Sequence, residues 1–112
     1  MAYILRQIDD IAIQHTSHGI GAKQVLLCGS ETKTPLTQIA RSSLLAGESV
    51  DEHVHPTMDE HYIVLGGEAV MTVDGRRLPL HCGSYLVVLA GSPHALTAKT
   101  DISFITIGVA TD

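Results

Sequence analysis

The stretch GESVDEHVHPTMDEHYIVLGG, residues 47–67, contains three side chains that can bind a metal: His53, His55 and Glu60. His53 and His55 are two positions apart, so in an extended strand both imidazoles point to the same face. Pro56 interrupts that strand and opens a turn, after which Glu60 begins a second strand. If the two strands are antiparallel neighbours, Glu60 returns towards the histidines and completes a three-ligand face for a transition metal.

The length and amino-acid composition of the chain predict one domain with an aliphatic core. The chain has 112 residues, of which 45% are hydrophobic and 17% charged, enough for one core but not two. The net charge is −5, and Lys and Arg are scattered apart from Arg76-Arg77, which argues against a nucleic-acid surface. The sequence has no apolar run of transmembrane length and no signal-like start. We therefore expect a cytoplasmic protein without nucleic-acid or membrane partners.

The two cysteines, Cys28 and Cys82, have neither the spacing of a zinc site nor that of a redox pair. Free thiols in a reducing compartment are the preferred interpretation.

Short apolar segments separated by glycine-rich turns recur along the chain, and none keeps a helical period over about twelve residues. Asp74-Gly75 is the strongest hairpin signal. This pattern predicts an all-β sandwich or barrel. An amphipathic turn around residues 7–13 is the one alternative left open. The expected strands cover residues 3–8, 11–13, 23–28, 36–45, 60–65, 68–73, 76–80, 85–89, 94–98 and 102–109.

His94 begins a strand directly after the turn Ala90-Gly91-Ser92-Pro93, and it shares an apolar face with Leu96 and Ala98. Alone, a histidine in that position is more often a core or rim residue than a ligand. Its position after residues 47–67 in the sequence makes a ligand role more favoured than the residue alone would suggest.

At this point the chain resembles the cupin superfamily, and in particular its small single-domain bacterial members. The first cupin motif is Gly-x5-His-x-His-x3,4-Glu-x6-Gly, and the second is Gly-x5-Pro-x-Gly-x2-His-x3-Asn. In the second motif Leu89 replaces the proline and Ala98 replaces the asparagine, which puts in doubt any activity that needs the asparagine. The positions that match are Gly47, His53, His55, Glu60 and Gly67 in the first motif, and Gly83, Gly91 and His94 in the second.

The resemblance implies a double-stranded β-helix, or jelly-roll barrel, formed by a single domain over residues 1–112. Residues 36–109 would be the conserved barrel, and residues 1–35 variable N-terminal strands that often pair across a homodimer. The implied metal ligands are His53, His55, Glu60 and His94. Such a set leaves coordination positions open for water or substrate. It suits Mn, Fe, Ni, Cu or Zn without choosing among them, and binding should weaken below about pH 6 because the ligands protonate.

These features favour a small metal-dependent enzyme that acts on a small oxygenated metabolite, either as an isomerase or lyase or as a dioxygenase. A non-catalytic small-ligand-binding module is the alternative, and a storage or structural role is a weaker third. The catalytic residues are not identified. Tyr62 shares the face of Glu60 and is a weak candidate, weighed evenly against a packed tyrosine of the barrel.

Other polar residues are placed by the same alternation. Met58 is expected at the mouth of the site, and His61 should point away from Glu60. Gln38 and Arg41 lie on the preceding strand, where either could reach a polar substrate. Histidines expected to be solvated are His15, His18 and His81.

Overall fold

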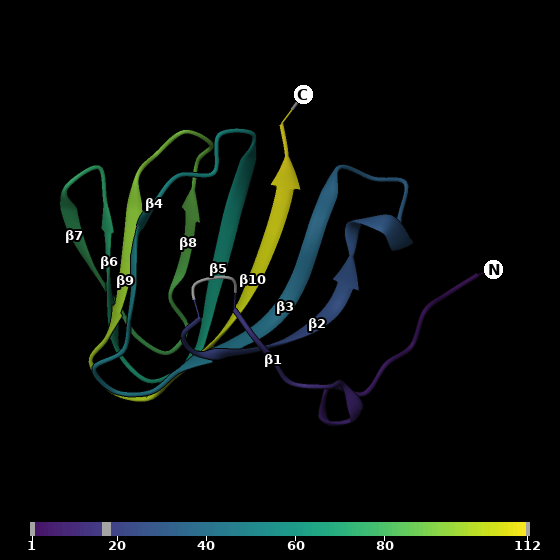
Figure 1. Ribbon diagram of the computed structural model, residues 1–112, viewed down its shortest axis with the longest axis horizontal. Coiled ribbons are helices and arrows are strands. Elements are labelled where there is room, and N and C mark those ends of the chain that lie inside the picture. Colours follow the sequence, from purple (N-terminus) through teal and green to yellow (C-terminus); the bar gives the residue numbers. More distant parts are fainter. Residues whose placement is uncertain (1, 17–18, 112) are drawn as a thin grey trace.

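The computed structural model describes residues 2–16 and 19–111, so His18 lies outside the described part of the chain. Two antiparallel sheets face each other across the interior (Figure 1). The strands are β1 (Gln14–His15), β2 (Ala22–Cys28), β3 (Leu36–Leu44), β4 (Ser49–His53), β5 (Met58–Gly66), β6 (Ala69–Val73), β7 (Arg76–Leu80), β8 (Tyr85–Val88), β9 (His94–Ala98) and β10 (Ile102–Ala110).

The strand order shows how the chain alternates between the sheets. The first sheet has the order β1-β2-β3-β10-β5-β8 and the second the order β4-β9-β6-β7. Consecutive strands such as β4 and β5 therefore lie in opposite sheets, and β9 and β10 do the same. This arrangement confirms the all-β, jelly-roll prediction. The described residues contain no helix long and apolar enough to cross a membrane.

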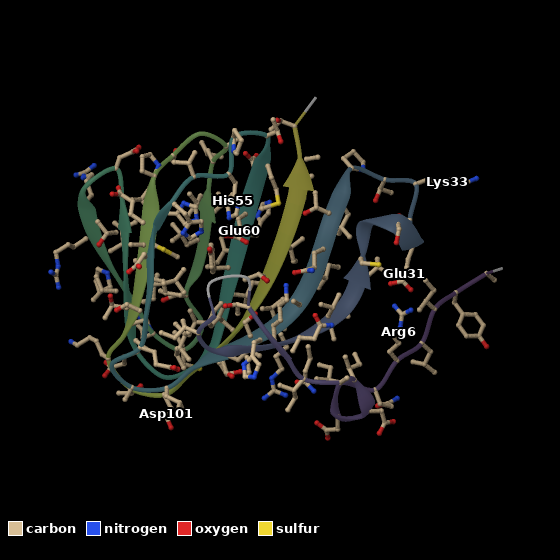
Figure 2. All side chains as sticks on the ribbon, in the orientation of Figure 1. Arg6, Glu31, Lys33, His55, Glu60 and Asp101 are labelled. Carbon is tan, nitrogen blue, oxygen red and sulfur yellow. The ribbon has the colours of Figure 1, made fainter. Side chains whose placement is uncertain are left out.

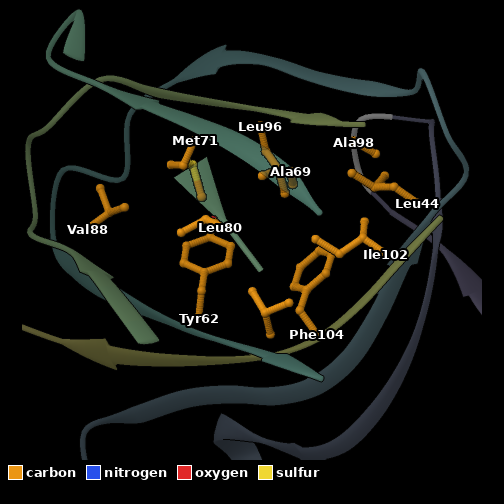
Figure 3. Close-up of a cluster of buried hydrophobic side chains, with 11 residues drawn as sticks. Leu44, Tyr62, Ala69, Met71, Leu80, Val88, Leu96, Ala98, Ile102 and Phe104 are labelled. Atoms are coloured by element: carbon orange, nitrogen blue, oxygen red, sulfur yellow. The ribbon is translucent and has the colours of Figure 1, made fainter. Parts of the chain in front are cut away.

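The core lies between the sheets and is filled by the alternating inward residues of both (Figure 3). Met71, on β6, is fully buried. Burying such aliphatic side chains is the main favourable term in folding. The buried cluster comprises Leu44, Tyr62, Val64, Ala69, Met71, Leu80, Val88, Leu96, Ala98, Ile102 and Phe104.

Two turns follow their sequence signals. Asp74 and Gly75 join β6 to β7 with φ values of 49° and 78°, as a two-residue hairpin with two left-handed positions requires. Gly67 has φ 88°, and a Cβ there would collide with the backbone of Asp101 and Ile102. Only glycine therefore allows the chain to pass so close to the start of β10.

The N-terminal segment differs from the prediction. Residues 3–8 form no strand; instead, an irregular stretch leads into a 3-10 turn, η1 (Ile8–Asp10), and β1 begins only at Gln14. A second 3-10 turn, η2 (Gly29–Glu31), follows β2. The early segment attaches through side chains, because Arg6 donates a hydrogen bond of 2.7 Å to the Leu26 carbonyl and pairs with Glu31 (Figure 2). β-Branched content alone does not make a strand where no backbone partner is available.

Candidate metal centre

Four side chains from three regions converge between the sheets. His53 ends β4 and His94 begins β9, and these two residues are direct partners across the β4–β9 pair. Glu60 lies on β5, in the facing sheet. The condition that its strand is the antiparallel neighbour of the histidine strand is not met: Glu60 meets the histidines from the opposite sheet. His55 lies two residues beyond the end of β4, in the segment that leads to β5.

The contacts between these side chains are short. His55 Nε2 lies 3.4 Å and His94 Nε2 lies 3.6 Å from the same oxygen, Oε1 of Glu60. The His53 ring centroid lies 4.2 Å from that of His94 and 4.9 Å from that of His55. His55 and Glu60 lie together between the two sheets in Figure 2. One potential ligand atom from each of the four residues lies within 4.8 Å of all the others.

Backbone carbonyls fix the tautomers of two histidines. His53 Nδ1 lies 2.8 Å from the Asp51 carbonyl, and His94 Nδ1 lies 3.0 Å from the Ser92 carbonyl. A carbonyl oxygen can only accept, so each Nδ1 carries a proton and each neutral ring has its lone pair on Nε2. Histidines that bind metals are commonly oriented by such a contact.

His94 Nε2 is a buried polar atom with no hydrogen-bond partner among the described residues. The side chain is only 1% exposed, and its distance of 3.6 Å to Glu60 is too long for a hydrogen bond. When the His94 ring is neutral, the lone pair of its Nε2 therefore faces the carboxylate oxygen Oε1 of Glu60 in a buried place. A proton or a cation between them would relieve this cost.

The ionisation of the pair follows from its surroundings. Burial tends to raise the pKa of Glu60, but the interaction with His94 and the hydrogen bond from Tyr62 outweigh it, so the pKa lies below the usual value. Burial tends to lower the pKa of His94, but Glu60 and the Ser92 carbonyl outweigh it, so that pKa lies above the usual value. The carboxylate form of Glu60 is thus favoured, as a metal ligand requires.

Tyr62 holds Glu60 in place. It lies two positions along β5, is 7% exposed, and donates its hydroxyl proton to Glu60 Oε1. Burial, together with the Glu60 charge, raises the pKa of Tyr62 well above its ordinary value. The phenol therefore stays protonated near neutral pH, which favours a positioning role over that of a general base.

The donor set fits a divalent cation. Nitrogen and oxygen ligands lie about 2.0–2.2 Å from such an ion, so donors of one coordination sphere lie within about 4.4 Å of each other. The span of 4.8 Å needs only a small inward rotation of the side chains. Three imidazoles and a carboxylate are borderline ligands that suit first-row transition metals. The cluster is therefore compatible with a divalent metal.

The cluster opens on a cavity of about 420 Å³. Gln38 and Met58 line this cavity, whereas Arg41 does not line it and contacts Ser103 instead. His61 is outside the cavity lining, and its Nδ1 lies 2.7 Å from the Tyr85 hydroxyl. His15 and His81 are exposed, as expected.

Sequence reasoning missed several polar residues of the cavity lining. Lys23 of β2, Ser42 of β3 and Thr106 of β10 all line the cavity. A single lysine at an inward position of a strand is a weak signal. These strands become part of the cavity only because the sheet curves around the interior, which no local pattern records.

Comparison with known proteins agrees with this architecture. An oxalate-binding protein from Thermotoga maritima is 33% identical over 70 residues, which span 61% of this chain and 58% of that protein. The crystal structure of a predicted oxalate decarboxylase from the same organism superposes with a TM-score of 0.88 at 24% identity, covering 96% of this chain and 99% of the other. Ectoine synthase from P. lautus superposes with a TM-score of 0.83 at 14% identity, covering 98% and 80%. The cupin domain family model matches residues 40–108, and the chain belongs to that family.

Proposed function

We propose that His53, His55, Glu60 and His94 bind one divalent transition metal ion, and that the protein is a small metal-dependent enzyme acting on a small carboxylic acid. The observation that carries this proposal is the buried Nε2 of His94, which has no hydrogen-bond partner among the described residues and lies 3.6 Å from Glu60 at the cavity. The candidate metals are Mn, Fe, Ni, Cu and Zn. The oxalate-related names of the two Thermotoga maritima proteins support a small acid as the ligand.

The chain's own residues supply binding and orientation. A bound divalent ion would act as a Lewis acid towards an oxygen of the ligand. Tyr62 holds the Glu60 carboxylate through its hydrogen bond. Val50, Leu96 and Phe104 supply apolar surface to the cavity lining. An isomerase or lyase reaction and a dioxygenation both use such a site.

A non-catalytic ligand-binding module is the second candidate. The titratable side chains that line the cavity are Lys23, Tyr62 and the four residues of the cluster. With the cluster used for metal binding and Tyr62 protonated, no carboxylate or histidine of the described lining is left to act as a general base. The name of the oxalate-binding relative also favours this second candidate.

Metal analysis of the natively purified protein tests the first step. We expect about one ion per chain, either as isolated or after reconstitution, because the four ligands form one site. Less than about 0.1 ion per chain after reconstitution would exclude the metal site. For the loaded protein, oxygen uptake and product analysis with small hydroxy- and keto-acids separate the two candidates: binding without turnover assigns a binding module.

Further properties of the chain are part of the same proposal. We expect one cupin domain over residues 1–112, with residues 36–109 as the barrel, that works in the cytoplasm. We also expect a homodimer, because the N-terminal segment exposes Tyr3 at 77% and Leu5 at 76%, and pairing would cover such side chains. Light scattering at micromolar concentration checks this; a monomer would contradict it.

A further inference from the structure

The cavity beside the metal centre has a second polar end, formed by Lys23 and Ser42. Lys23 is the single Lys or Arg among the described residues that line it. The Lys23 ammonium forms no ion pair or hydrogen bond with another described residue. Ser42 is only 8% exposed, and its hydroxyl likewise has no partner among the residues that the structure describes. An unpaired ammonium beside a hydroxyl in a cavity wall is suited to an anionic group.

Sheet register places this end away from the cluster. Lys23 pairs with Ser42, Ser42 with Phe104, and Phe104 with Val64, so these four residues form one row across the first sheet. Glu60 lies four residues before Val64 on β5. The row from Lys23 to Val64 spans about 14 Å across the strands, and Glu60 lies about 13 Å from Val64 along β5. On a flat sheet the Cα atoms of Lys23 and Glu60 would therefore lie about 19 Å apart. Curvature and side-chain length shorten the gap, but oxalate, whose carboxylates are directly joined, does not bridge it.

The cavity lining includes both apolar and polar residues besides the two ends. Leu96 of β9 and Phe104 of β10 are apolar and suit a hydrocarbon spacer. Gln38 and Thr106 are polar, and their side chains make no hydrogen bond to another described residue. Gln38 and Glu60 both pair with Gly108, where a Cβ would overlap Thr37 and Met58. The space beside Gly108 is therefore filled by the Thr37 and Met58 side chains, and Gln38 and Glu60 lie on either side of this position.

From these observations we infer that the ligand is an elongated acid with two functional ends. An oxygen-bearing head lies at the metal centre, a hydrocarbon spacer contacts Leu96 and Phe104, and a terminal carboxylate binds Lys23 and Ser42. The Gln38 amide is placed to bind a hydroxyl or keto oxygen near the head. This inference rests on the proposed metal site for the head, whereas the Lys23 end stands on its own residues. A single lysine balances one negative charge, which favours a carboxylate over a phosphate.

Calorimetric titration with oxalate, succinate, adipate and pimelate tests the length of the ligand. Zn(II)-loaded protein, with its metal content measured first, should bind adipate or pimelate more tightly than oxalate. Lys23→Met should weaken the longer acids by about 10- to 100-fold, because a hydrogen bond to a charged group is lost. It should leave oxalate and Zn(II) affinity unchanged. Lys23→Arg should keep most of the affinity, which shows that a loss in Lys23→Met does not come from misfolding.

Two control variants fix the location of the anionic end. Lys99→Met removes a charge from an exposed position outside the cavity and should change nothing. Lys23 also borders a second cavity, of about 360 Å³, which Arg41 lines and the metal cluster does not. If Arg41→Met weakens adipate as much as Lys23→Met does, the acid binds in that second cavity and the inference is wrong. Tighter binding of oxalate than of the longer acids would also overturn it, as would tighter binding of phosphate than of adipate.

The metal-free protein separates this inference from the proposed function. Hexanoate carries a carboxylate and a hydrocarbon chain but no second head, so its binding reports on the Lys23 end alone. A wild-type protein that holds no metal but binds hexanoate in a Lys23-dependent way would refute the metal site and support the anionic end. A protein that binds Zn(II) stoichiometrically, with adipate affinity unchanged in Lys23→Met, would support the metal site and refute the anionic end.

Discussion

The two ends of the barrel interior are built from the same strands but differ in chemistry. Along β5 the inward positions change from Glu60 to Tyr62 to Val64, and along β9 they change from His94 to Leu96 to Ala98. Within four residues each strand passes from a polar cluster to the closed apolar core. At the closed end, Ile102 is 3% exposed. Because strand alternation fixes which face each residue occupies, one end can vary its chemistry without altering the register of the other.

Stability and the site can therefore be assigned to separate groups of inward side chains. The closed end buries aliphatic groups that stabilise the fold. The open end contains the unsatisfied His94 Nε2, which costs stability in the absence of a cation. Tyr62 is the boundary residue, since its ring belongs to the core and its hydroxyl binds Glu60. Variants at each end should therefore affect different measurements.

The largest effect is expected at the open end. His94→Ala removes one of the four proposed ligands, and metal affinity should fall by more than about 100-fold, beyond the loss seen when residues behind a ligand are changed. The protein should still fold, because the β4–β9 pairing does not depend on the imidazole. Isothermal titration with Zn(II) measures the affinity, and circular dichroism checks the fold. His81→Ala, at an exposed position, is the matched control; equal losses in both variants would contradict the assignment.

The closed end should respond in the opposite way. Ile102→Ala leaves a cavity among Leu44, Ala98 and their neighbours, and the unfolding free energy of the metal-free protein should fall by about 2–5 kcal/mol. Urea denaturation measures this change. The number of ions bound per folded chain should stay at the wild-type value. A variant that folds but loses its metal would show that the two ends are coupled.

The boundary residue should show an intermediate result. Tyr62→Phe keeps the ring in the core and removes the hydrogen bond to Glu60, so metal affinity should fall by about 10- to 100-fold. Thermal stability of the metal-free protein should change little, because the buried ring is kept. An unchanged metal affinity would mean that Glu60 needs no such support.

The sequence predicted the fold well where patterns are local. Asp74-Gly75 marked a hairpin, and the spacing of Gly47, His53, His55, Glu60 and Gly67 indicated the family. The sequence left open how Glu60 reaches the histidines, because local spacing does not say whether consecutive strands lie in one sheet or in two. Lys23 was missed for the same physical reason: only the curvature of the first sheet brings β2 to the cavity. The strand predicted at residues 3–8 failed because no backbone partner is present among the described residues.

The smallest effect is expected in the N-terminal segment, residues 2–11. The question is whether this segment opens independently of the barrel. Arg6 and hydrogen bonds from Cys28 lower the pKa of Glu31 from 4.5 to about 2. A lowered pKa means that the charged pair favours docking above pH 4.5 and that this contribution is lost as the pH falls from about 4.5 to about 2. Since the pair is largely exposed, the loss should be small and limited to residues 2–11 and β2. Hydrogen exchange should therefore show β2 amides losing protection in that range while β9 amides keep theirs, and Glu31→Gln should remove the pH dependence. Simultaneous loss of protection in β9 would mean that the N-terminal segment and the barrel unfold together. The N-terminal segment would then not be an independent region, and only the two ends of the barrel interior would remain separable.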